Sequence, residues 1–252
     1  MSLLEGRGVS KTFGGVTALA AVDFQVREGE IYGLIGPNGA GKTTLMNVIS
    51  GLIPRTAGDI RFAGRAIAGL PPHRIAALGI ARTFQVVQPL QGLTVCENVA
   101  VGAIFAGRKP IGEALARAQE VLRRVELWPL RDSLATDITL GQQKKLELAR
   151  ALAMEPRLLL LDESMAGLNL QEVGVSMDLV RAIRDSGVTV IIIEHVMKAI
   201  MGICDRVHVL HAGRTITVGP PREVAEHEKV IEAYLGERYS ARSGRDGAGV
   251  RP

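Results

Sequence analysis

The stretch Gly36-Pro37-Asn38-Gly39-Ala40-Gly41-Lys42-Thr43-Thr44 matches in full the spacing G-x-x-x-x-G-K-[ST]. An apolar run with strand character precedes it at residues 30–35, and residues 45–50 behind it have the apolar spacing of a helix. The glycines therefore lie at a predicted turn from a strand into a helix. This motif in this setting predicts a loop that binds phosphate groups.

The residue types of the loop fit the binding of a nucleotide. Gly36, Gly39 and Gly41 allow backbone conformations in which several N–H groups turn inward, and the N-terminus of the following helix adds its partial positive charge. We expect Lys42 to reach the β- and γ-phosphates and the hydroxyl of Thr43 to bind Mg²⁺. The whole stretch 36–44 is the predicted phosphate-binding segment, but alone it indicates a nucleotide and no particular reaction.

The composition limits the class of protein. The chain has 252 residues, of which 47% are hydrophobic, so it can bury a large core as one domain or as one domain with a subdomain. Its formal net charge is +4, but residues 238–252 carry +3 of it, which leaves +1 for the rest. An excess confined to a Gly/Ser/Arg tail is not a basic face, so we expect no nucleic-acid partner and a disordered tail at 237–252.

The sequence also limits where the protein works. Cys96 and Cys204 are isolated in apolar segments without metal-binding spacing, and we expect both to be small buried side chains. The N-terminus lacks the features of a signal peptide, and no stretch approaches the ~18 apolar residues that span a bilayer. We therefore expect a protein on the cytoplasmic side that reaches a membrane only peripherally, through a partner.

The hydrophobic pattern predicts an α/β fold with an antiparallel part and a helical part. Alternating segments at 3–12 and 18–27, joined by Gly14-Gly15, predict an N-terminal antiparallel β subdomain. Helical spacing from Thr94 to Trp128 predicts an α-helical subdomain inserted at about 86–155. One helix of this region has an apolar stripe at spacings of three and four, formed by Ala114, Leu115, Ala118, Val121, Leu122 and Val125.

The remaining strands alternate with helices, which predicts a mostly parallel sheet with helices on both faces, the fold of a P-loop NTPase. Residues 1–236 are expected to form this single domain. The strands predicted after the phosphate loop are 59–63, 80–84, 158–161 and 188–193.

Two buried strands end in polar side chains. Asp162 and Glu163 follow the four leucines at 158–161, and His195 comes two residues after the strand at 188–193. In an open parallel sheet the ligand lies beyond the carboxyl ends of the strands, where the phosphate loop also lies. We expect Asp162 to orient Mg²⁺, Glu163 to position the attacking water and His195 to contact the γ-phosphate, which suffices for phosphoryl transfer to water.

Other polar residues leave alternatives open. Gln85 follows the predicted strand at 80–84, where its amide can complete the shell of the metal or of the water, although a glutamine at the end of a strand is commonly solvated. The remaining histidines have no such placement. We expect a structural or surface position for His73, His208, His211 and His227.

Together these motifs resemble the nucleotide-binding subunit of an ATP-binding-cassette (ABC) transporter, over the chain up to about Gly236. The resemblance implies that Phe13 stacks on adenine and that Gln85 belongs to the loop that senses the membrane partner. It also implies ATP as the nucleotide, with Mg²⁺. Residues 138–142 stand where the family has its L-S-G-G-Q signature, and the implied nucleotide contacts there are Thr139, Gly141 and Gln142.

By the same resemblance, Asp162 is the metal-site acid, Glu163 the catalytic carboxylate and His195 the switch histidine. The sequence departs from the family pattern at several other positions. Leu140 replaces the first signature glycine, and Phe13 lacks the hydroxyl of the commoner tyrosine but keeps its ring face. Two more departures lie in the loop that links the two ATP sites, where Ser164 stands for a common proline and Asn169 for a common aspartate.

Several phrases look like the branched-chain amino acid type of importer: 11–19, 81–85, 93–99 and 165–169. That similarity implies a second ABC ATPase subunit, two transmembrane permeases and an extracytoplasmic solute-binding protein. The solute is then leucine, isoleucine or valine by kinship, while urea, amides and aromatic acids stay open. The alternatives are the ATPase of an exporter of lipid or lipopolysaccharide and a soluble cassette ATPase without a transport role.

The resemblance further implies a mechanism that needs two subunits. Each ATP would lie between the phosphate loop of one subunit and the signature of the other, so that Thr139 and Gly141 close on a γ-phosphate held by the partner's Lys42. The residues 86–90 are apolar for a loop, and we expect them to border the groove that receives a helix of the permease.

Overall fold

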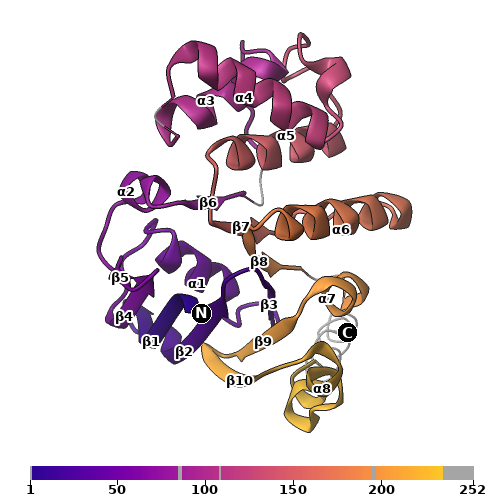
Figure 1. Cartoon of the computed structure of the whole chain (residues 1–252). Coiled ribbons are helices and arrows are strands. Elements are labelled where there is room, and N and C mark those ends of the chain that lie inside the picture. The colour runs from indigo at the N-terminus through magenta and orange to yellow at the C-terminus, as the bar shows by residue number, and fades with distance from the viewer. Residues whose placement is uncertain (1, 85–86, 108, 195–196, 235–252) are drawn as a thin grey trace, which may run out of the picture.

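The main sheet of the chain has six strands in the order β10-β9-β3-β8-β7-β6 (Figure 1). The structure is a computed structural model and describes residues 2–84, 87–107, 109–194 and 197–234. Neighbouring strands from β9 to β6 run parallel, while β10 pairs antiparallel with β9, which confirms the predicted mostly parallel sheet. The strands are β3 (Ile31–Ile35), β6 (Ile80–Arg82), β7 (Leu158–Asp162), β8 (Thr189–Ile193), β9 (Arg206–His211) and β10 (Arg214–Gly219).

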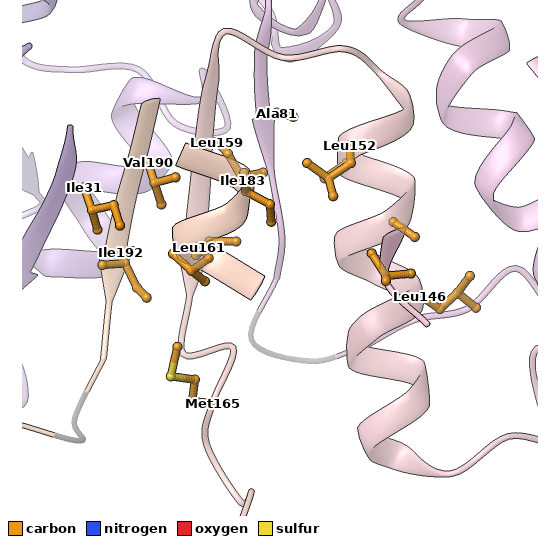
Figure 2. Close-up of a cluster of buried hydrophobic side chains, with 14 of the residues drawn as sticks. Ile31, Ala81, Leu146, Leu152, Leu159, Leu161, Met165, Ile183, Val190 and Ile192 are labelled. Atoms are coloured by element: carbon orange, nitrogen blue, oxygen red, sulfur yellow. The ribbon is translucent and has the colours of Figure 1, made fainter. Parts of the chain in front are cut away.

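Both faces of this sheet are buried, because side chains alternate along each strand. Leu159 and Leu161 of β7 pack in one cluster with Ile183 of α6 and with residues of α5, as Figure 2 shows. Leu158 and Leu160 belong to a second cluster on the opposite face. The helices of the two layers are α1 (Lys42–Ile49), α5 (Leu140–Ala153), α6 (Leu170–Asp185), α7 (Met197–Ile203) and α8 (Pro221–Glu226). Burial on both faces explains the continuous apolar run at 158–161.

A smaller antiparallel sheet with the order β2-β1-β4-β5 lies over α1 and the second face. It confirms the predicted N-terminal pair, and β1 ends at Phe13 as expected. Leu4, Val22 and Phe62 pack in the cluster that also holds Met46 of α1. The elements here are β1 (Ser2–Phe13), β2 (Val16–Arg27), β4 (Ala57–Phe62), β5 (Arg65–Ala66) and the short helix α2 (Pro72–Ala77) before β6.

Three helices and a single 3₁₀ turn pack together at the top of Figure 1. They are α3 (Val95–Phe105), α4 (Ile111–Arg124), η1 (Trp128–Leu130) and α5. The predicted stripe of α4 faces inward: Ala114, Ala118, Val121 and Leu122 are buried, whereas Leu115 is only partly buried against them. The helices are as expected, while the boundaries at about 86–155 and at 236 stay predictions.

Two expectations from the sequence are wrong in detail. β6 ends at Arg82 and not at Phe84, because the Phe84 N–H donates to the buried Glu147 carboxylate of α5 at 2.7 Å and so leaves the sheet. Cys96 is only half-buried, because it lies at the exposed start of α3, while Cys204 is buried as expected. Among the described residues, none of the helices combines the length and the apolar character that crossing a bilayer requires.

His208 has a structural position, one of the two alternatives that the sequence left open for it. It lies fully buried on β9, where its Nδ1 is 3.0 Å from the Tyr32 hydroxyl and its Nε2 is 2.8 Å from the Thr215 hydroxyl. Burial, helped by the nearby Arg206 guanidinium, lowers the pKa of His208 to about 4. The ring is therefore neutral in the folded chain at neutral pH.

We expect acid to destabilise the wild-type chain more than a His208→Gln variant. In the unfolded chain the ring takes up a proton near pH 6.5, but in the folded chain only near pH 4. The neutral buried ring therefore contributes stability that is complete above pH 6.5 and is lost as the pH falls toward 4. The gap between the two pKa values corresponds to about 3 kcal/mol. Urea unfolding at neutral pH and near pH 4.5 measures the difference. Parallel losses of unfolding free energy in both proteins would contradict the assignment.

Candidate active site

Two positions of the phosphate loop, Gly36 and Gly41, have no room for a Cβ atom. Gly36 and Gly41 have positive φ angles of 150° and 102°. A Cβ atom would come within 2.1 Å of the Leu210 carbonyl oxygen at Gly36 and within 2.6 Å of the Ala18 carbonyl oxygen at Gly41. A larger residue at either position would therefore clash with the backbone of a neighbouring segment, in the loop that leads into α1 at Lys42.

The Lys42 side chain is held inside this loop. Its ammonium donates to the carbonyl oxygens of Gly36 and Pro37 at 2.7 and 2.9 Å, and the residue is buried. An ammonium in this position, next to the N-terminus of α1, makes the loop a positive pocket for phosphate oxygens. The structure thus brings the predicted residues 36–44 together as one cradle.

Asp162, at the end of β7, lies in a buried ion pair that the sequence analysis missed. Its Oδ2 accepts from Arg82 Nη2 at 2.8 Å, and the two side chains are only 3% and 7% exposed. Arg82 Nη1 also donates to Asn47 Oδ1 at 2.6 Å and to Ser50 Oγ at 3.0 Å, both near the end of α1. The arginine therefore ties the strand of Asp162 to the helix of the phosphate loop.

The donor set at this place fits a hard cation such as Mg²⁺. The second oxygen of Asp162, Oδ1, is buried and has no hydrogen-bond partner among the described residues. A buried oxygen without a partner is costly unless a ligand or water satisfies it, and Mg²⁺ prefers carboxylate, hydroxyl and water oxygens. Thr43, which the sequence predicts as the second oxygen ligand of this ion, is exposed in the first turn of α1.

Glu163 follows Asp162 in an unusual backbone conformation. Its φ is +50°, a left-handed value that non-glycine residues adopt rarely, and its N–H donates to the Ile193 carbonyl oxygen at 2.9 Å. Glu163 also lines a cleft of about 450 Å³ between α5 and α6. The strand end thus presents its second carboxylate to an open space, while Asp162 stays buried.

The same cleft is lined by the signature residues Thr139, Gly141 and Gln142. Thr139 caps α5: its hydroxyl accepts the Gln142 N–H at 3.4 Å, and its own N–H donates to Gln142 Oε1 at 2.9 Å. Leu140 between them is 62% exposed, so the side chain that replaces the family's glycine points away from the core. Among its described lining residues the cleft has none from the phosphate loop.

Three further predicted residues lie apart from this cleft or outside the described residues. Phe13 is 48% exposed at the end of β1, and Lys11 Nζ lies over its ring at 4.7 Å from the ring centre. Gln85 and His195 lie outside the described residues, and their roles stay predictions.

Comparison with known proteins adds to this geometry. Residues 19–166 match the family model described as ABC transporter, and residues 214–240 match the one described as branched-chain amino acid ATP-binding cassette transporter. The high-affinity branched-chain amino acid transport ATP-binding protein LivG of Salmonella typhimurium strain LT2 is 39% identical over 250 residues, covering 93% of this chain and 98% of LivG. The chain belongs to the ABC transporter family. This cassette is therefore an ATPase whose hydrolysis of ATP is coupled to transport.

Solved structures agree with that assignment. The ADP conformation of MJ1267, an ATP-binding cassette of an ABC transporter, has a TM-score of 0.86 at 32% identity and covers 94% of this cassette and 99% of MJ1267. MJ0796, a bacterial ABC transporter cassette solved as a dimer, has a TM-score of 0.79 at 27% identity and covers 87% of this cassette and 99% of MJ0796. MJ1267 was thus solved in an ADP conformation, and MJ0796 was solved as a dimer.

Proposed function

We propose that this cassette is the ATP-hydrolysing subunit of an importer that takes up branched-chain amino acids or related small solutes. The observation that carries the proposal is the match of its C-terminal residues 214–240 to the branched-chain amino acid type, together with the LivG relative. We infer that the cassette lies peripherally on the cytoplasmic side of the membrane, bound to two permeases. A second cassette and an extracytoplasmic solute-binding protein complete the proposed system.

The residues of the site divide the work of hydrolysis. Lys42 and the backbone N–H groups of 36–44 bind the β- and γ-phosphates of ATP, while Phe13 stacks on the adenine. Thr43 and Asp162 hold Mg²⁺, which supplies charge neutralisation at the phosphate oxygens. Glu163 positions and polarises the attacking water, so the chemistry is mostly positioning and charge stabilisation. Gln85 and His195 complete this proposal as metal and γ-phosphate contacts.

Among the described residues of one chain, the signature residues and the phosphate loop do not share a cleft, so a second cassette is needed to bring them together. Thr139 and Gly141 lie at the N-terminus of α5, which favours negative charge, yet they share their cleft with Glu163 and not with the described phosphate loop. We infer that they close on the γ-phosphate held by Lys42 of the partner cassette. ATP then stabilises the closed pair, and its hydrolysis releases it, which changes the facing of the permeases.

A groove on the cassette suits the permease. It has a volume of about 430 Å³, lies between α2 and the α3–α5 helices, and is lined by apolar side chains that include Leu52, Phe84, Leu90 and Phe105. Phe105 is 79% exposed, which is unusual for so large an apolar side chain. Gln88 borders the groove, because its carbonyl oxygen accepts from Arg150 at 2.9 Å and Arg150 lines the groove. We infer that a helix of the permease docks here.

We expect a cysteine at Gln88 to crosslink to the permease in the assembled transporter. The crosslinking should weaken when Phe105→Glu places a charge in the groove, because that change opposes apolar contact. A cysteine at Arg65, exposed on β5 of the small sheet, is the control. Native Cys96 and Cys204 are replaced by alanine in every variant. Crosslinks confined to the cassette itself, or equal ones from both positions, would contradict docking at this groove.

Uptake by cells tests the proposed function as a whole. In cells that lack this cassette but keep its permeases, wild-type protein should restore uptake of labelled leucine, isoleucine or valine, and Glu163→Gln should not. If the wild-type protein restores the uptake of another small solute instead, that solute replaces the branched-chain amino acids in the proposal. If wild-type protein restores no uptake of any solute, the importer assignment fails.

A further inference from the structure

The loop that follows Glu163 is held in a strained shape. Glu163 has a φ of +50°, and such left-handed conformations of non-glycine residues persist only where the surrounding structure holds them. The turn closes when the Ala166 N–H donates to the Glu163 carbonyl oxygen at 3.2 Å. What holds this turn therefore also sets where the Glu163 side chain points.

The end of β8 and the residue after it hold the turn. The Ile193 carbonyl oxygen accepts the Glu163 N–H at 2.9 Å. One residue on, Glu194 Oε1 accepts the Met165 N–H at 2.6 Å and the Ser164 hydroxyl at 3.3 Å. Glu194 is only 3% exposed. A buried carboxylate thus receives two donors from the two residues that follow Glu163.

Burial, hydrogen bonds and nearby charges act together on the Glu194 carboxyl group. Burial raises the pKa of its carboxyl, and the Met165 N–H and Ser164 hydroxyl act in the opposite direction. Glu163 adds a repulsive charge, while Lys144 adds an attractive one. A carboxylate is costly to bury, so its retention here needs the hydrogen bonds that it accepts.

Two other contacts anchor the same loop. The Met165 side chain is 1% exposed and packs in the cluster below Leu161 (Figure 2). Lys144 of α5 donates to the Ala166 carbonyl oxygen. Glu194 joins the loop to the end of the neighbouring strand by two hydrogen bonds, and their donors are the two residues that directly follow Glu163.

We propose that Glu194 is a positioning residue that fixes the direction of the Glu163 carboxylate by hydrogen-bonding Ser164 and Met165. The proposal rests on the proposed function in one respect, the role of Glu163 in hydrolysis. Ser164 also has a role in this proposal, because its hydroxyl is one of the two donors to Glu194. Loss of Glu194 releases the turn and moves Glu163 away from the water, but leaves the phosphate loop in place.

The test compares Glu194→Ala, Glu194→Gln and Ser164→Ala in the full chain. For Glu194→Ala we expect kcat for ATP to fall at least about tenfold with the KM for ATP within about twofold, because positioning acts on the chemical step. Glu194→Gln keeps an acceptor oxygen of the same shape and should stay within about threefold of wild type. Ser164→Ala, which removes the longer bond, should lower kcat by about threefold.

A matched control separates positioning from general damage. Glu30 is also a buried glutamate, 6% exposed, and accepts the Arg27 N–H at 2.6 Å. It directly precedes β3, whereas the phosphate loop follows the other end of that strand. Glu30→Ala should lower the melting temperature and leave kcat per folded molecule within about twofold. Amide hydrogen exchange of residues 163–169 should accelerate in Glu194→Ala and stay unchanged in Glu30→Ala.

The outcomes are distinct. A kcat of Glu194→Ala that matches Glu30→Ala, with unchanged exchange at 163–169, overturns the proposal. If Glu194→Ala does not fold, Ser164→Ala decides, and its unchanged kcat and exchange overturn the proposal equally. Glu163→Gln is measured beside them: if it keeps turnover, the proposed role of Glu163 fails, whereas its loss of turnover beside a normal Glu194→Ala refutes only the positioning.

Discussion

Glu163→Gln is expected to lower ATP turnover by the purified cassette at least about 100-fold, because the amide can no longer polarise the attacking water. The backbone turn should survive, since the Glu163 N–H to Ile193 bond does not involve the side chain. ATP binding should stay within about twofold of wild type, because the phosphate loop is untouched. Phosphate release and the binding of a fluorescent ATP analogue measure the two effects.

The same variant tests the closed pair. Because it binds ATP without hydrolysing it, Glu163→Gln should run as a stable dimer in the presence of ATP and Mg²⁺, alone or with its partner subunit. Glu126→Gln is the control, since Glu126 lines the same cleft but pairs with Lys145 at the surface. It should keep turnover and the wild-type association state. Dimers in neither protein, or hydrolysis retained in Glu163→Gln, would remove the main support for the mechanism.

Arg82→Met is expected to lower the free energy of unfolding by about 3–5 kcal/mol, because it leaves the buried Asp162 carboxylate without its partner. Asn47 and Ser50 lose a donor in the same change. The loss should be visible without nucleotide in urea unfolding at neutral pH. Arg82→Lys keeps the charge but has its donors on one nitrogen instead of the two that Arg82 uses for its three partners, so an intermediate loss is expected.

A double variant shows whether the buried charge causes this loss. Arg82→Met with Asp162→Asn removes the unpaired charge and should recover at least about half of the lost free energy. If the double variant is as unstable as Arg82→Met alone, packing around the methylene groups of the arginine is the cause. A loss below about 1 kcal/mol in Arg82→Met would mean that the ion pair contributes little to stability.

The sequence alone sufficed for the parts of the site that lie in continuous motifs. The loop at 36–44 and the strand ending at Asp162 were predictable, since their glycines and leucines report local backbone needs and burial. The Thr139 to Gln142 cap was not foreseen as such, although its capping-box spacing was present in the sequence.

The remaining contacts could not be predicted, because they join residues far apart in sequence. Arg82 meets Asp162 only because β6 and β7 are neighbours in one register, in which Arg82 pairs with Leu160. An arginine in an apolar strand was the available signal, since a buried guanidinium requires a partner. In the sequence Glu194 stands only between a buried strand and His195, and its contacts with Ser164 and Met165 depend on the turn at Glu163.

The central claim is that hydrolysis at this site drives import. It is tested most directly by vanadate-sensitive ATP hydrolysis in liposomes that hold the cassette with its permeases, with and without solute-loaded binding protein. Turnover by wild-type protein should rise severalfold with the loaded binding protein and vanish in Glu163→Gln. Turnover that is indifferent to the permeases and to the binding protein would contradict the claim.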